Sequence, residues 1–204
     1  MNSNNKIDCI KLVLDYRSGN QNNIEKRALK QCEESNDLWE KCVLLKFFTS
    51  PQSNKAEEII KKDLKIAHPV NNTSGDGNKK GINYEIKVSI HDKKGLVNLR
   101  QIRPHHNIDY YIIVSYNLFK TPLGQAAIFK IPSSVLYGCI PEYGGYTHGT
   151  VDRNGEITSQ SVHDTGTDFE YSLTANPNAD SSKKQGRLWQ LFKEWAVDYN
   201  EFNF

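Results

Sequence analysis

The chain contains only four cysteines, and their spacing argues against a zinc site and a disulfide framework. No two of them form a Cys-x-x-Cys pair, and no set of cysteines and histidines has the spacing of a zinc site. We therefore expect free, buried thiols in a reducing compartment rather than a disulfide framework. The four are Cys9, Cys32, Cys42 and Cys139.

Long hydrophobic runs are also missing. No segment is apolar enough over a sufficient length to span a membrane, and no apolar run near residue 1 resembles a signal peptide. These absences predict a cytoplasmic protein without membrane contact. The net charge is only +2, with 25% charged and 37% hydrophobic residues, as in an ordinary globular protein. A length of 204 residues allows one domain with a sizeable core.

Positive charge is concentrated in one part of the chain. Residues 79–106 contain seven lysines and arginines but only two carboxylates, Glu85 and Asp92. Basic charge around carboxylates suits a polyanionic substrate such as nucleic acid, whereas a solvated hairpin face is the alternative explanation. The seven basic residues are Lys79, Lys80, Lys87, Lys93, Lys94, Arg100 and Arg103.

Hydrophobic periodicity predicts helices at both ends of the chain and strands between them. Residues 1–65 are expected to be mainly helical, and residues 181–204 to form an amphipathic helix. Alternating or β-branched segments predict strands at 82–90, 110–116 and 126–131. This order of elements indicates an α/β fold with a mixed sheet.

Two further segments have weaker patterns. Residues 96–103 are predicted to form a short helix, because their apolar residues recur at helical spacing and Pro104 follows. Residues 138–180 are rich in Gly, Asn, Asp, Ser and Thr, which predicts loops and short strands.

The strand at 82–90 has the most informative pattern. Its alternation places Glu85 and Lys87 side by side on one face, opposite the apolar face. Asp76 stands upstream in a glycine-rich turn. Two carboxylates that can close on a divalent metal, with an ammonium beside them, suit phosphodiester hydrolysis. The alternative for Glu85 and Lys87 is an exposed strand face with an ion pair of little energetic value.

An acidic-x-Lys triplet alone is not specific, because three occur in the chain. They are Asp63-Leu-Lys65, Glu85-Ile-Lys87 and Asp92-Lys-Lys94. Only the Glu85 triplet combines an alternating strand with an acidic residue in an upstream turn, so it is the candidate we retain.

Longer segments around the triplet extend the pattern. They are Ser-Gly-Asp-Gly at 74–77, Tyr-Glu-Ile-Lys-Val-Ser at 84–89, Leu-Arg-Gln-Ile-Arg-Pro-His-His at 99–106, Asp-Tyr-Tyr-Ile at 109–112, Phe-Lys-Ile-Pro-Ser at 129–133, Gly-Gly-Tyr-Thr-His-Gly-Thr at 144–150 and Glu-Tyr-Ser-Leu at 170–173. With these segments the chain resembles type II restriction endonucleases of the PD-(D/E)xK nuclease superfamily, over roughly residues 70–195. One departure is that Gly75 precedes Asp76, where the superfamily name implies proline.

The resemblance implies a PD-(D/E)xK restriction-endonuclease-like core: a leading helix, a hairpin with the acidic residues, a crossover helix and a further strand. It implies that Asp76 and Glu85 bind Mg²⁺, an ion that prefers carboxylate oxygens, and that Lys87 lies by the attacking water. Glu57 or Glu58 on the preceding helix is a further candidate ligand. The single domain 1–204 would divide into a helical N-terminal part (1–65), a catalytic core (70–137), a loop-rich DNA-reading region (138–180) and a C-terminal helix (181–204).

Eight residues are candidates for contact with DNA, and several have a plainer alternative. Gln101 and Arg103 are expected to reach a phosphate, with a polar helix face as the alternative for Gln101. A role for His148 in a DNA groove competes with an ordinary surface turn. The eight are Lys79, Lys80, Gln101, Arg103, His105, His106, His148 and Thr150.

The implied activity is Mg²⁺-dependent, sequence-specific hydrolysis of phosphodiester bonds in double-stranded DNA. A homodimer is expected, because a two-fold axis lets two chains cut both strands of a palindrome. The alternatives are a structure-specific or repair nuclease of the same fold and a non-catalytic DNA-binding module.

Overall fold

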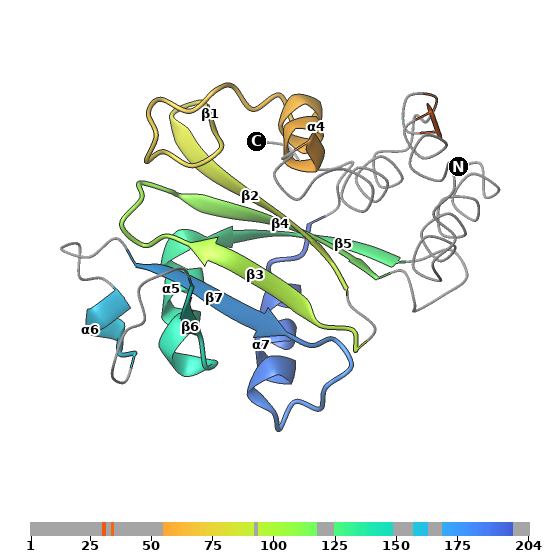
Figure 1. Ribbon diagram of the computed structural model, residues 1–204, viewed down its shortest axis with the longest axis vertical. Helices are drawn as coiled ribbons and strands as arrows, with labels where there is room; N and C mark the ends of the chain where they lie inside the picture. The colour runs from red at the N-terminus through yellow and green to blue at the C-terminus, as the bar shows by residue number, and fades with distance from the viewer. Residues whose placement is uncertain are drawn as a thin grey trace.

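A computed structural model describes residues 55–91, 94–117, 125–148, 157–162 and 169–197, together with the single residues 30, 31 and 34. Two β-sheets with helices around them make up this part of the chain (Figure 1). The fold is therefore mixed α/β, with a mixed sheet flanked by helices, as the sequence predicts. Thr150 and most of the N-terminal part, residues 1–54, lie outside the described residues.

The first sheet has four strands in the order β1-β2-β4-β5. Their bounds are β1 Gly77–Lys79, β2 Ile82–Ile90, β4 Tyr110–Asn117 and β5 Gln125–Pro132. β2 pairs antiparallel with β1 and parallel with β4, and β4 pairs antiparallel with β5. The three strands expected from alternation and β-branched content are confirmed. β1 begins directly after the glycine-rich turn that contains Asp76.

The second sheet has three antiparallel strands in the order β3-β7-β6. Their bounds are β3 Val97–Ile102, β6 Tyr146–His148 and β7 Glu170–Ala175. The prediction of a crossover helix at 96–103 is therefore wrong. The pairing of β3 shifts between Leu99 and Ile102, and Gln101 has a φ of 57°. This bulge adds one residue, so Leu99 and Ile102 are both buried and imitate helical spacing.

Four helices are described: α4 Lys55–Asp63, α5 Ser133–Glu142, α6 Ser159–Val162 and α7 Lys184–Glu194. α7 confirms a C-terminal amphipathic helix, with Leu188, Trp189 and Phe192 buried on one face. Its bounds are narrower than 181–204. Residues 138–180 hold short strands as predicted, but also the end of α5 and all of α6. No described helix is long and apolar enough to cross a membrane. Cys139 is a buried free thiol.

Both faces of the four-stranded sheet are covered. On one face, Ile60 of α4 and Leu64, which follows α4, pack against Tyr84 and Ile86 of β2. On the other face, β4 and β5 pack against the second sheet, α5 and α7, and Tyr111 belongs to this larger cluster. Burying each large apolar side chain stabilises the fold by roughly 1.5–3 kcal/mol. Polar residues of β2 that face the second cluster are consequently enclosed by protein.

Candidate active site

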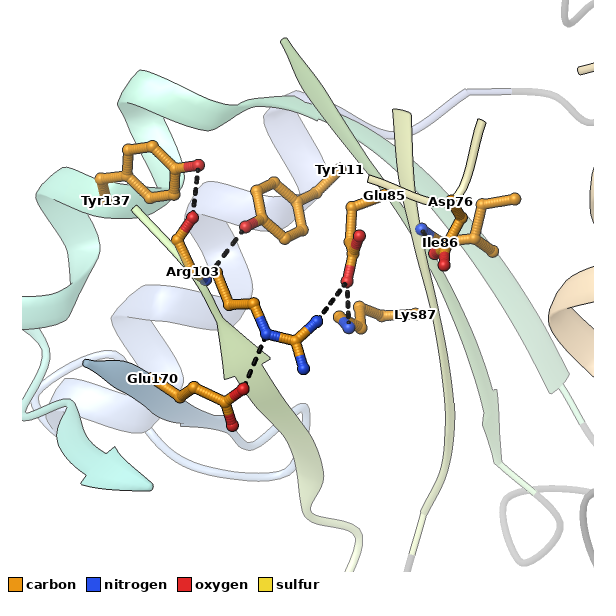
Figure 2. Close-up of polar contacts among 8 residues, drawn as sticks. All are labelled: Asp76, Glu85, Ile86, Lys87, Arg103, Tyr111, Tyr137 and Glu170. Atoms are coloured by element: carbon orange, nitrogen blue, oxygen red, sulfur yellow. Dashed lines mark hydrogen bonds and ion pairs between the residues drawn. The ribbon is translucent and has the colours of Figure 1, made fainter. Parts of the chain in front are cut away.

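Glu85 lies in this enclosed region, between the two sheets. Only 3% of the residue is exposed, so the alternative of an exposed strand face is wrong. A buried carboxylate requires compensation, because transfer of a charge out of water is costly. Lys87 Nζ lies 2.5 Å from Glu85 Oε1, and Arg103 Nη1 lies 4.0 Å from the same oxygen. Figure 2 shows Glu85 and Lys87 extending from β2 toward Arg103 at the end of β3.

Asp76 is held beside these residues by the turn that precedes β1. Its backbone N–H donates to Tyr84 O at 2.8 Å, and its carboxylate Oδ2 accepts a 2.7 Å hydrogen bond from the N–H of Ile86. Ile86 is the residue between Glu85 and Lys87. The structure therefore brings the three predicted catalytic residues, Asp76, Glu85 and Lys87, to one place.

The approach of Asp76 to β2 depends on glycine at position 75. Gly75 has a φ of +72°, and a Cβ there would lie 2.5 Å from Tyr84 O. Neither the conformation nor the contact suits another residue, so a side chain here would push the Asp76 turn away from β2. The glycine that replaces the expected proline thus has a structural reason.

We predict that Gly75→Ala lowers the free energy of unfolding of the protein, because the turn must move. Gly81→Ala is the matched control: Gly81 also has positive φ, +84°, but a Cβ there has nothing within 4 Å. Both variants are expected to lose about 1 kcal/mol from the positive φ. Urea unfolding measures the stability of both variants. Equal losses in the two variants would contradict this role for Gly75.

The environment of Asp76 disfavours its charged form. Burial raises the pKa of the Asp76 carboxyl, and the negative charge of Glu85 raises it further. The Ile86 N–H and the ammonium groups of Lys87 and Lys61 act in the opposite direction. Two carboxylates that repel each other at such a place favour a bound cation, because the cation removes the repulsion.

The donor set fits Mg²⁺. This ion is commonly held by one or two carboxylates plus substrate phosphate oxygens, and it keeps several waters. In the part of the chain that the structure describes, no group of three His, Cys, Asp or Glu side chains is placed to hold a metal ion. A closed protein cage of the zinc type is therefore not present among those residues. Asp76 and Glu85 are the two that would hold Mg²⁺.

The helix α4 has a carboxylate, Glu58, that is linked to this site through Lys61. Lys61, whose side chain is 11% exposed, lies 2.5 Å from Glu58 Oε1 and acts on Asp76 from the α4 side. Lys61 therefore interacts electrostatically with both Glu58 and Asp76. The proposal that Glu57 or Glu58 contributes to the metal site stays a prediction.

Arg103 is more firmly fixed than the sequence indicates. Its Nε donates to Glu170 Oε1 at 2.7 Å (Figure 2). Its backbone N–H donates to the Tyr111 hydroxyl and its carbonyl accepts from the Tyr137 hydroxyl, both at 3.4 Å. Burial raises the pKa of both tyrosines, so both stay neutral. The sequence assigns no individual role to Glu170, Tyr111 or Tyr137, because only the packing of β7, β4 and α5 places them here.

The candidate DNA contacts do not all lie near the carboxylates. Lys79 pairs with Ile82, whose side chain belongs to the α4 face, and its ammonium donates to Leu64 O at 2.8 Å. Lys79 therefore lies on the opposite face of the sheet from Glu85. Lys80 is exposed in the β1–β2 turn, and Gln101 is exposed at the bulge of β3.

The histidine candidates fall into two groups. His105 and His106 follow β3, with ring centroids 4.7 Å apart in an edge-to-face arrangement. Burial, His105 and Arg103 lower the pKa of His106, which keeps it neutral near pH 7. His148 pairs with Glu170 across β6 and β7, two strands from β3. The DNA contacts of all three stay predictions, as does that of Thr150.

Comparisons of the chain with models of protein families, with curated proteins and with solved structures found no match. The case for a function therefore depends on the geometry of the residues described above.

Proposed function

We propose that the protein is a Mg²⁺-dependent endonuclease that cuts double-stranded DNA at a specific sequence, as a type II restriction endonuclease of the PD-(D/E)xK superfamily does. The observation that carries the proposal is the hydrogen bond from Ile86 N–H to Asp76, because it joins the acidic turn to the strand between Glu85 and Lys87. Burial of Glu85 supports the proposal, because an apolar side chain at such a position would usually give a lower free energy of folding than a charged one.

Each side chain has a role that its position allows. Asp76 and Glu85 would hold the metal ion, which lowers the pKa of a bound water and neutralises charge developing on the phosphate. Lys87, beside Glu85, can donate a hydrogen bond to the attacking water and add positive charge. Arg103, whose Nη1 lies 4.0 Å from the same Glu85 oxygen as Lys87, is positioned for a phosphate oxygen (Figure 2).

The proposal includes the partner and the location of the protein. One chain would read half of a palindrome and cut one strand, and a two-fold homodimer would cut both. The strand β6 and the residues that follow it, through Thr150, are the segment we assign to base reading. A cytoplasmic location would keep Cys139 reduced.

Incubation of the protein with plasmid DNA tests the proposal directly. We expect discrete fragments in the presence of Mg²⁺ and intact plasmid when EDTA is present, because the carboxylates alone cannot activate water. The control variant is Glu194→Gln, which removes an exposed carboxylate from α7 and should cut normally.

Three other results would favour the alternatives. Cleavage only of branched or damaged DNA would indicate a structure-specific or repair nuclease. A gel shift without cleavage would indicate a DNA-binding module. Absence of both cleavage and binding would contradict every DNA-directed function considered for this site.

A further inference from the structure

The guanidinium of Arg103 lies between two carboxylates. Glu170 accepts from Nε at 2.7 Å, while Glu85 is 4.0 Å from Nη1. Arginine has five N–H donors in a planar fork, and a single bond to Nε leaves the outer donors directed elsewhere. The Arg103 side chain is 26% exposed, so these donors are accessible to a ligand. A phosphate diester is an anion that such a fork can bind.

Glu170 lies in the region 138–180 that we assign to DNA reading, and its side chain contacts Arg103 of the catalytic core. It is the first residue of β7, the central strand of the second sheet. On one side, β7 pairs with β6, where His148 is directly opposite Glu170. On the other side, β7 pairs with β3, and Arg103 follows the last residue of β3. The backbone of Glu170 therefore pairs with β6, and its side chain contacts the arginine beside Glu85.

We propose that Glu170 is a positioning residue: it holds Arg103 against a backbone phosphate of the DNA and keeps it away from Glu85. The inference rests on the proposed nuclease function and adds a residue to it. Glu170 itself touches neither the phosphate nor the reacting atoms. Its 2.7 Å bond to Nε sets the direction of the guanidinium, and the hydroxyls of Tyr111 and Tyr137 fix the backbone of the same residue.

The charges explain why a positioning residue is needed. Without Glu170, the remaining ion-pair partner of Arg103 among the described residues is Glu85, at 4.0 Å. Opposite charges at that separation attract strongly in a partly buried site, so the guanidinium would close on Glu85. Arg103 would then leave the phosphate and compete with Mg²⁺ for Glu85.

The variants Glu170→Ala and Glu170→Gln separate this role from a structural one. Glutamine keeps an oxygen that can accept from Nε, so it should retain more function than alanine. For Glu170→Ala we expect duplex binding in EDTA to weaken roughly tenfold, the scale of one hydrogen bond to a charged group. We also expect single-turnover cleavage to fall by on the order of tenfold to a hundredfold, because the phosphate contact is misplaced. The Mg²⁺ concentration for half-maximal rate should rise.

A second set of variants makes the test decisive. In an Arg103→Ala background, Glu170→Ala should have no further effect on binding or on the Mg²⁺ requirement, since its role acts through Arg103. Arg103→Ala alone should reduce the slope of log K against log salt by about one phosphate contact. Thermal unfolding of each variant checks that the fold is kept. Wild-type behaviour of Glu170→Ala, or equal losses with and without Arg103, would overturn the inference.

The binding measurement in EDTA requires no cleavage, which distinguishes the inference from the proposed function. If the protein binds duplex DNA but does not cut it, the nuclease proposal fails while the Glu170–Arg103 coupling is still measured. If cleavage occurs and the coupling is absent, the inference alone fails.

Discussion

Asp76→Asn is expected to remove DNA cleavage and at the same time to raise the thermal stability of the protein. Cleavage should fall by at least about 10²–10³-fold, the scale of losing one preorganised charged contact in an active site. Asparagine keeps an oxygen that can accept from Ile86 N–H, so the turn should stay in place. Stability should rise because burial and the charge of Glu85 raise the pKa of the Asp76 carboxyl.

The pH dependence follows from the direction of that shift. The ordinary pKa of this carboxyl is 3.8, and a raised pKa means that it binds its proton more tightly in the folded protein than in the unfolded chain. The free energy of unfolding therefore falls as pH rises from about 3.8 through the higher folded pKa, and the full cost is present at neutral pH. Asp76→Asn removes this cost, so its gain in Tm should be larger at pH 7 than below the ordinary pKa.

Asp180→Asn is the control for this experiment. Hydrogen bonds from Ser182 lower the pKa of exposed Asp180, which is the opposite direction. This variant should show no gain in Tm and should cut DNA normally. A fall in the stability of Asp76→Asn at pH 7, or cleavage at the wild-type rate, would contradict our assignment of Asp76.

Lys87→Met is expected to destabilise the protein as well as to inactivate it. The side chain of Glu85 is 4% exposed, and Lys87 is its 2.5 Å partner. Removing that ammonium leaves a buried carboxylate with Arg103 at 4.0 Å as its remaining ion-pair partner. We expect a loss of roughly 1–3 kcal/mol in the free energy of unfolding, measured with urea.

A double-mutant cycle assigns this loss to the pair. Glu85→Gln in the Lys87→Met protein should recover most of the stability and none of the activity, because no buried charge is then left without its partner. The exposed pair Lys30–Glu34, with N and O atoms 3.7 Å apart, provides the control. Lys30→Met should change stability by less than about 0.5 kcal/mol. Additive losses in the buried pair would show that Glu85 and Lys87 are not coupled.

The sequence predicted those features that depend on local pattern. Strict alternation located β2, and β-branched content located β4 and β5, because side chains on a pleated strand have a period of two. The grouping of Asp76 with Glu85 and Lys87 followed from a turn and a strand that are adjacent in the chain. Its physical basis, the Ile86 N–H bond and the close approach at Gly75, required coordinates.

Features that depend on the pairing of strands far apart in the chain could not be predicted from the sequence. The helix predicted at 96–103 was wrong because a bulge at Gln101 gives a strand the spacing of a helix. Glu170 was not identified, because it meets Arg103 only when β7 pairs with β3, although 67 residues separate them in the chain. Lys79 was predicted to contact DNA from its charge alone, but its position in β1 places its side chain on the α4 face of the sheet.

The bulge in β3 also keeps Arg103 on the side of Glu170, although this strand has one residue more than the partner segment of β7. In a straight strand of the same length, every residue after the bulge position would have the opposite parity, so Arg103 would be directed away from both Glu85 and Glu170. Deletion of Gln101, whose side chain is exposed, should therefore be tolerated in relatives of this protein, because it leaves Ile102 opposite Tyr171.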